Sequence, residues 1–152
     1  MWFSDTGPLA DGLAQAMISD WAKVGVTVEP RSVEKAEWLR RLNAKEFDME
    51  LQTNTVTTGD ADFTLGRLYD SAADRMGYHN PALDQILHEA HENSDQDTRG
   101  TLYAQACKTI WDDAVGIFPA ALISTYGLRS TVRDFEPAPS NQPDLRGVTI
   151  GT

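Results

Sequence analysis

Apolar residues near the N-terminus follow first a helical spacing and then a strand spacing. A predicted helix starts at Pro8 and ends before Gly25, and apolar residues recur at every fourth position in it: Leu9, Leu13, Met17 and Trp21. A glycine suits the left-handed backbone with which many helices end. Three valines then alternate with other residues ahead of Pro30, and they predict a strand: Val24, Val26 and Val28.

The alternation of helix and strand continues to residue 52. Trp2 and Phe3 are interpreted as the end of an opening strand. Ser32 is the predicted N-cap of a second helix, whose apolar side carries three residues: Trp38, Leu39 and Leu42. Met49 and Leu51 alternate with polar residues and predict a third strand. This order of elements predicts an α/β fold, with a mixed sheet and flanking helices.

The second half of the chain reads as helices followed by extended chain. Helices are predicted at residues 62–69, after Asn80-Pro81, and after Ser94 or Asp95. The last of them has five residues predicted to face inward: Leu102, Tyr103, Ala106, Ile110 and Trp111. The apolar run 117–126 predicts a strand, and the proline-containing tail 132–152 predicts extended chain that needs another surface to lie on.

Between the third predicted strand and the helix at 62–69 lies a polar loop. Short hydrogen-bonding side chains fill it: Thr53, Asn54, Thr55, Thr57 and Thr58. Gly59 allows unusual backbone angles, and Asp60 or Asp62 can cap the following helix. In α/β proteins, ligands often bind where a strand end leads to a helix N-terminus. The spacing alone also fits an ordinary connector.

Composition narrows the range of partners. With 13 Lys and Arg against 23 Asp and Glu, the chain of 152 residues carries a formal charge of −10. Nucleic acid and anionic membrane surfaces are therefore not expected as partners, and no stretch is long and apolar enough to predict a membrane span. Cys107 is the only cysteine, and its apolar neighbours predict a small buried side chain. We interpret the scattered acids as solubilising.

No motif supports enzymatic chemistry, and no cofactor or metal is predicted. His88 and His91 are three residues apart, whereas the helical zinc motif needs two histidines four apart. Asp60-Ala61-Asp62 begins like a calcium loop but lacks the later oxygen ligands. No nucleophile, acid or base has an orienting partner in the sequence, so no catalytic residue is predicted.

Several short segments together resemble one family of proteins. In order, they are Asp20 to Glu29, Glu46 to Met49, Thr58 to Leu65, Gly77 to Asp84, Asp97 to Tyr103, Ile110 to Asp113, Ile117 to Pro119 and Asp144 to Val148. Their order and spacing resemble the peptide-, nickel- and glutathione-binding class of periplasmic solute-binding proteins of ABC importers, extracellular solute-binding protein family 5. Residues 58–65 look most like the glutathione-binding branch.

The resemblance implies a fragment of a longer, two-lobed protein with a type II periplasmic-binding-protein-like fold. Residues 1–131 would form the C-terminal ligand-binding lobe. Residues 132–152 would be a tail that crosses back to an N-terminal lobe. The parent protein would be periplasmic or otherwise extracytoplasmic, with an export signal outside this chain, and it would deliver its solute to the membrane subunits of an ABC importer without itself inserting into the membrane.

The resemblance also implies a ligand-binding role for the polar loop. The predicted contacts to a peptide-like or other small polar solute are Thr53, Asn54, Thr55, Thr57, Thr58 and Asp60. Many family members carry a tryptophan where Asn54 stands, and peptide binders often carry an aspartate where Thr57 stands. Pairing with the ligand's amino terminus is therefore not carried over. The alternative hypothesis is a free-standing α/β interaction or regulatory domain without a transport role.

Overall fold

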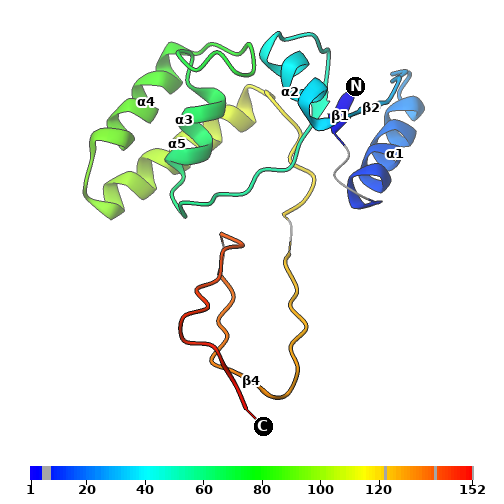
Figure 1. Ribbon diagram of the computed structural model, residues 1–152. Coiled ribbons are helices and arrows are strands. Elements are labelled where there is room, and N and C mark those ends of the chain that lie inside the picture. The colour runs from blue at the N-terminus through cyan, green and yellow to red at the C-terminus, as the bar shows by residue number, and fades with distance from the viewer. Residues whose placement is uncertain (5–7, 122, 139, 152) are drawn as a thin grey trace. The chain divides into compact units, whose positions relative to one another are not determined.

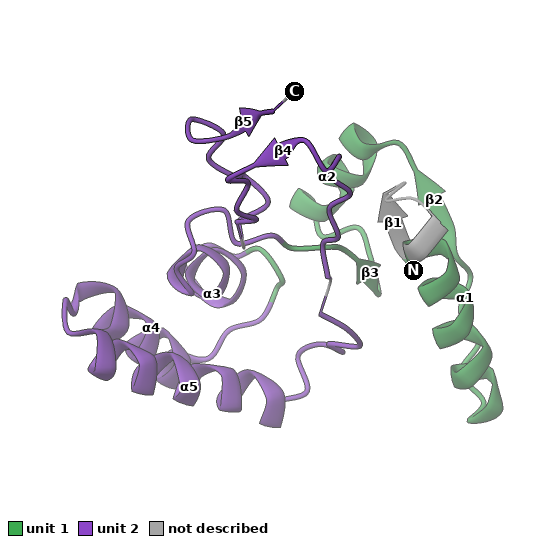
Figure 2. Cartoon of the chain, turned by 90° about the horizontal axis from the view of Figure 1, so that it is seen from below, with its two compact units in different colours: residues 1–54, 75–77 green, residues 55–74, 78–152 purple. Residues whose placement is uncertain are grey.

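The computed structural model describes residues 1–4, 8–121, 123–138 and 140–151, which form helices and short strands (Figure 1). The helices are α1 (Pro8–Lys23), α2 (Lys35–Asn43), α3 (Asp62–Tyr69), α4 (Pro81–Glu92) and α5 (Gln96–Asp112). The strands are β1 (Trp2–Ser4), β2 (Arg31–Val33), β3 (Glu50–Leu51), β4 (Val132–Arg133) and β5 (Thr149–Ile150). The chain divides into two compact units, residues 1–54 with 75–77, and residues 55–74 with 78–152 (Figure 2).

The first unit is a parallel three-stranded sheet with the order β2-β1-β3. Trp2 pairs with Arg31 on one side and with Glu50 on the other. At the end of α1, Gly25 has a φ of +84°, so the predicted glycine stop is confirmed. The predicted α/β class with flanking helices is confirmed as well.

The position predicted for the second strand was wrong. Residues 26–30 have no regular structure, and the strand that pairs with β1 is Arg31–Val33. Val24 and Val26 are 76% and 42% exposed, so their alternation marks no buried face. The chain meets β1 through Arg31, whose backbone N–H donates to the Met1 carbonyl at 2.9 Å.

The predicted start of the second helix was wrong for the same reason. Ser32 lies in β2, paired with Phe3, so its backbone is extended and it cannot cap α2. The N-cap is Glu34, whose carboxylate accepts a hydrogen bond from the Ala36 N–H at 2.8 Å. On α2, Leu42 is buried as predicted, while Leu39 is 41% exposed.

The second unit begins with three helices packed in sequence order. The predicted helix starts at Asn80 and Asp95 are confirmed, because each side chain caps its helix through backbone N–H groups. Inward-facing residues of these helices form the core: Leu65, Leu68, Tyr69, Leu83, Leu87, Ala90, Tyr103, Ala106 and Ile110.

In the first unit, the side chain of Leu9, predicted to face inward on α1, lies outside the described residues.

Two predictions for α5 were wrong. Tyr103, Ala106 and Ile110 follow the three-and-four spacing of one helical face and are buried. Trp111 and Cys107 each follow one of these residues directly, so they are rotated away from that face and are exposed, Trp111 by 68%. Cys107 is thus not the buried side chain that its apolar neighbours predicted.

The segment after α5 is extended and largely exposed. No strand forms among residues 117–121 and 123–126, so the strand predicted at 117–126 was wrong. Within 132–151, β4 and β5 pair antiparallel with each other, Val132 opposite Ile150. The predicted division at residue 131 stays a prediction. In the part of the chain that the structure describes, no helix has the length and apolar character that crossing a membrane requires.

Candidate functional site

The polar loop runs from the end of β3 to the start of α3, and five of the six predicted contact residues in it are exposed. Thr53 and Asn54 belong to the first compact unit, whereas Thr55, Thr57 and Thr58 belong to the second. The predicted contact residues are therefore divided between the two units.

A tight turn shapes the second half of the loop. Gly59 has a φ of +73°, which a residue with a Cβ rarely adopts, and its N–H donates to the Val56 carbonyl at 3.3 Å. The Thr58 hydroxyl accepts a hydrogen bond from the Asp60 N–H at 3.2 Å. These bonds leave the side chain of Thr57 exposed at the bend.

Asp60 differs from the other five residues because both of its carboxylate oxygens are engaged. One oxygen accepts a hydrogen bond from the Asp62 N–H at 2.9 Å, although the N-cap position of α3 is Ala61 and not Asp60 or Asp62 as predicted. The other lies 2.5 Å from Nη2 of Arg99, which follows 39 residues later in the chain. The side chain of Asp60 is 45% exposed, whereas that of Arg99 is only 13% exposed.

Arg99 is held by the turn between α4 and α5 as well as by Asp60. Its Nη1 donates to the carbonyl oxygens of Ala90 at 3.0 Å and Asn93 at 3.3 Å. These acceptors lie at the C-terminal end of α4, where carbonyl groups have no partner within the helix and favour a cation. The guanidinium carbon also lies 5.3 Å from the centre of the Tyr103 ring.

Asp62, in the first turn of α3, extends this polar network. One carboxylate oxygen lies 3.1 Å from Nδ1 of His91, and the other accepts a hydrogen bond from the Tyr103 hydroxyl at 3.4 Å. Burial raises the pKa of Tyr103, and the negative charge of Asp62 raises it further. The network thus ties the start of α3 to α4 and α5.

The histidines form separate surface pairs. His88 lies 3.3 Å from Glu92 and His79 lies 3.4 Å from Asp74, while His91 faces Asp62. Across the described ranges, no group of three or more His, Cys, Asp or Glu side chains is placed to hold a metal ion.

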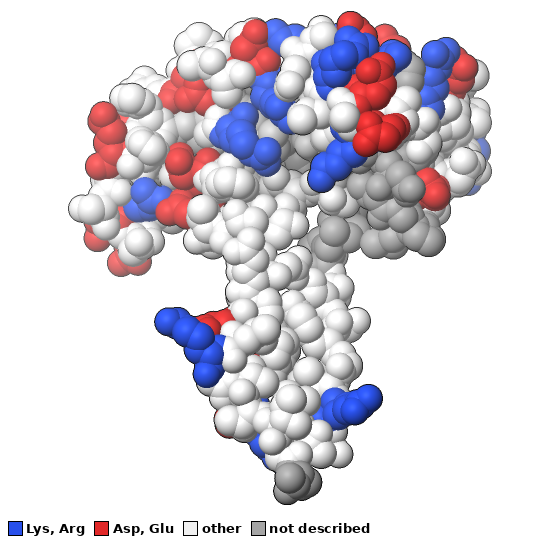
Figure 3. Space-filling model, in the orientation of Figure 1, with Lys and Arg blue, Asp and Glu red and all other residues white. Residues whose placement is uncertain are grey.

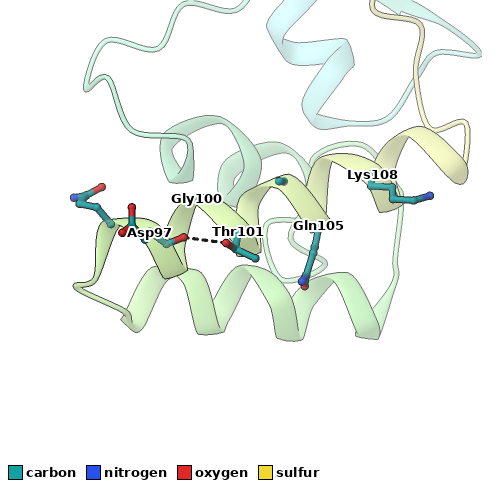
Figure 4. Close-up of a pocket in the computed structure, with 7 residues that line it drawn as sticks. Asp97, Gly100, Thr101, Gln105 and Lys108 are labelled. Atoms are coloured by element: carbon teal, nitrogen blue, oxygen red, sulfur yellow. Dashed lines mark hydrogen bonds between the residues drawn. The ribbon is translucent and has the colours of Figure 1, made fainter.

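A shallow hollow lies along α5, and none of the six predicted contact residues lines it. It has a volume of about 690 Å³ and is lined by residues of that helix alone: Gln96, Asp97, Gly100, Thr101, Ala104, Gln105 and Lys108. Figure 4 shows these side chains along α5, with the Thr101 hydroxyl donating to the Asp97 carbonyl at 3.0 Å. A hollow built on one helix encloses little of a ligand.

Charged side chains of both signs are interspersed over the helices on the face drawn in Figure 3. The extended segment after α5 is largely uncharged in the same view. Neither pattern indicates a continuous basic surface for a polyanion.

Arg99 is the residue of this site that sequence reasoning missed. Little in the sequence indicated its role, because an arginine in the first turn of a helix is usually an ordinary surface residue. Only the packing of α3 and α5 against α4 brings it to Asp60.

Comparisons with known proteins identify relatives of nearly the whole chain. No protein-family model matches it. Di/tripeptide-binding protein 3 of Pseudomonas aeruginosa is 34% identical over 149 residues, which cover 93% of this chain and 27% of that protein. A dipeptide-binding protein of the same species is 32% identical over 148 residues, covering 93% and 27%. The chain thus spans about a quarter of the length of the curated relatives it matches.

Solved structures agree in fold. HbpA2 from Haemophilus parasuis matches with a TM-score of 0.77 at 20% identity, over 99% of this chain and 32% of that one. A dipeptide-binding protein from Pseudoalteromonas in complex with Met-Leu matches with a TM-score of 0.72 at 21% identity, over 98% and 31%. These likenesses confirm the predicted fold of one periplasmic-binding-protein lobe. The chain is related, across nearly its whole length, to part of the solute-binding proteins of ABC importers in the peptide-, nickel- and heme-binding class.

Proposed function

We propose that this chain is one ligand-binding lobe of an extracytoplasmic solute-binding protein that serves an ABC importer. The parent protein would capture a peptide-like or other small polar solute in a cleft between two lobes and close around it by a hinge motion. It would then pass the solute to the importer's membrane subunits. The chain would act by binding and not by catalysis.

The observation that carries this proposal is the 34% identity to a di/tripeptide-binding protein across 93% of the chain. The coverage of about a quarter of each curated relative supports the assignment to a fragment of a longer protein. No comparison supports the alternative of a free-standing interaction or regulatory domain.

The exposed apolar segment after α5 fits the same proposal. Seven of its large apolar residues are between 41% and 89% exposed: Ile117, Phe118, Ile123, Tyr126, Leu128, Leu145 and Ile150. Exposure of so many large apolar side chains is typical of a surface that another part of a protein covers. We propose that the remainder of the parent protein, including its other lobe, covers this segment.

Binding to the complete parent protein tests the proposal. A thermal-shift screen with short peptides, followed by calorimetry, should identify a bound solute. Thr57→Val removes the exposed hydroxyl and keeps the side-chain shape, so it should weaken binding about 2- to 10-fold, as the loss of one neutral hydrogen bond does. The matched control is Thr101→Val in the hollow along α5, which should change the affinity less than about twofold.

The proposal fails if the complete protein binds none of the peptides or other small polar solutes screened. A larger loss of affinity in Thr101→Val than in Thr57→Val would instead indicate that the solute binds along α5 and not at the loop.

A further inference from the structure

We propose that Arg99 is a positioning residue of the ligand loop. Arg99 would fix the last turn of the loop on the α4–α5 pair and neutralise Asp60, the loop's only carboxylate, so that the loop offers a solute only neutral hydrogen-bonding groups. This inference rests on the proposed function, and it narrows the group that faces the loop to an amide, a hydroxyl or another uncharged group.

Both carboxylate oxygens of Asp60 are already occupied. One carboxylate oxygen accepts a hydrogen bond from Asp62 N–H and the other is paired with Arg99. A cationic ligand group would have to compete with a guanidinium already in place. Charge-assisted bonds of this kind are among the strongest polar contacts in proteins.

Arg99 itself has little freedom to move. The two carbonyl bonds to Ala90 and Asn93, the ring of Tyr103 and the 13% exposure of its side chain fix the guanidinium on the helix pair. A lysine could supply the positive charge, but it lacks the planar fork that reaches two carbonyls and a carboxylate together. Arg99 is thus built to hold Asp60 at one position.

The side chains of the loop that remain available to a solute are uncharged. Apart from Asp60, residues 53–60 carry no ionisable side chain. The Thr58 hydroxyl already accepts a bond from the Asp60 N–H, so the network also orients a neutral group next to the exposed Thr57. Movement of Asp60 would therefore disturb the turn on which Thr57 and Thr58 lie.

Hydrogen exchange of the 152-residue chain tests the positioning role without any ligand. The reporters are the amides of Gly59, Asp60 and Asp62, each bonded within the turn. Arg99→Met should speed their exchange at least about tenfold relative to amides within α4, and Arg99→Lys should restore part of the protection. The control Arg146→Met removes an exposed ion pair with Asp144 and should leave the loop unchanged.

Equal acceleration of loop and α4 amides in Arg99→Met would overturn the positioning role, because it would indicate a general loss of stability. No acceleration in either region would overturn it as well. Either result is independent of what the protein binds.

Calorimetry on the complete parent protein tests the neutral-loop inference. The probes are the dipeptide Ala-Ala and its N-acetylated form, and the variant is Asp60→Asn. We expect the substitution to change both affinities by the same factor. If it reduces the preference for the free amino form tenfold or more, Asp60 pairs with the ammonium group and the inference is overturned. If neither dipeptide binds, the peptide-like solute of the proposed function fails, while the exchange result still decides the role of Arg99.

Discussion

Glu50 holds a carboxyl group that binds a proton near neutral pH. Burial raises its pKa to about 7, and the charge of Arg75 only partly opposes this rise. Its Oε2 is buried without a hydrogen-bond partner among the described residues. The charged form is therefore the unfavourable one in the folded protein.

The stability of the chain should consequently fall as the pH rises. The folded pKa of Glu50 lies above its unfolded value of 4.5, so its contribution is fully present below pH 4.5 and is lost as the pH passes about 7. Glu50→Gln should be the more stable form at pH 8, on the order of 2 kcal/mol, with a smaller difference at pH 5. Urea unfolding at both pH values measures this.

The matched control is Glu89→Gln on the exposed face of α4, where Glu89 accepts a hydrogen bond from Gln85. It should leave the pH dependence of the wild type unchanged. If Glu50→Gln has the same pH dependence as the wild type, Glu50 is ionised at little cost.

Asn80 combines two functions at the start of α4. Its Oδ1 accepts bonds from the Ala82 and Leu83 N–H groups, and its Nδ2 donates to Asp113 at 2.9 Å. Asn80→Ala should lower the free energy of unfolding by about 1 kcal/mol or somewhat more. Asn80→Asp keeps the capping oxygen but loses the donor to Asp113, so an intermediate loss is expected in thermal unfolding. Equal stability of Asn80→Ala and the wild type would rule out the capping role.

At the scale of single elements, helices with strong end signals were predictable and short strands were not. Asn80-Pro81 and Asp95 each cap a helix by local chemistry, so the sequence around them predicts the helix start. β2 has three residues, and its position depends on pairing with β1, which no local pattern encodes. The alternation of Val24, Val26 and Val28 was therefore misleading.

The same limit applies to the third strand and to the loop after it. Met49 is 39% exposed while the carboxyl of Glu50 is largely buried, the reverse of the apolar face predicted there. In the loop, Asp60 or Asp62 was predicted as the cap of α3, but the N-cap position is Ala61, which makes no side-chain cap hydrogen bond; the Asp60 carboxylate accepts a hydrogen bond from the Asp62 N–H beside it. Its partner Arg99 is 39 residues away, a separation that local patterns cannot bridge.

The exposed face of α5 gives a direct test of its orientation. Cys107 lies on that face, so a maleimide should label its thiol in the native chain at a rate close to that of the unfolded chain. Labelling can be followed by mass spectrometry with and without urea. Labelling that occurs only in urea would show that Cys107 is buried, as its apolar neighbours predicted.

At the scale of the whole molecule, the chain spans about a quarter of the length of its curated relatives. Trp111 stacks on Phe118 with ring centres 6.3 Å apart, in a region where both side chains are more than half exposed, as expected if the proposed remainder of the parent protein covers it. The order of short motifs along the chain predicted the relationship to solute-binding proteins, and the relatives bear this out. In the proposed two-lobed protein, groups on the other side of the cleft would also select the solute.

Calorimetry with the solute found in the screen measures the central proposal most directly, by comparing the 152-residue chain with the complete parent protein. A lone lobe supplies only part of the contacts that a closed cleft provides. We predict clear binding to the complete protein and binding at least about 100-fold weaker, or none, to the chain alone, a difference of about 3 kcal/mol or more. Equal affinities for the two proteins would contradict the account.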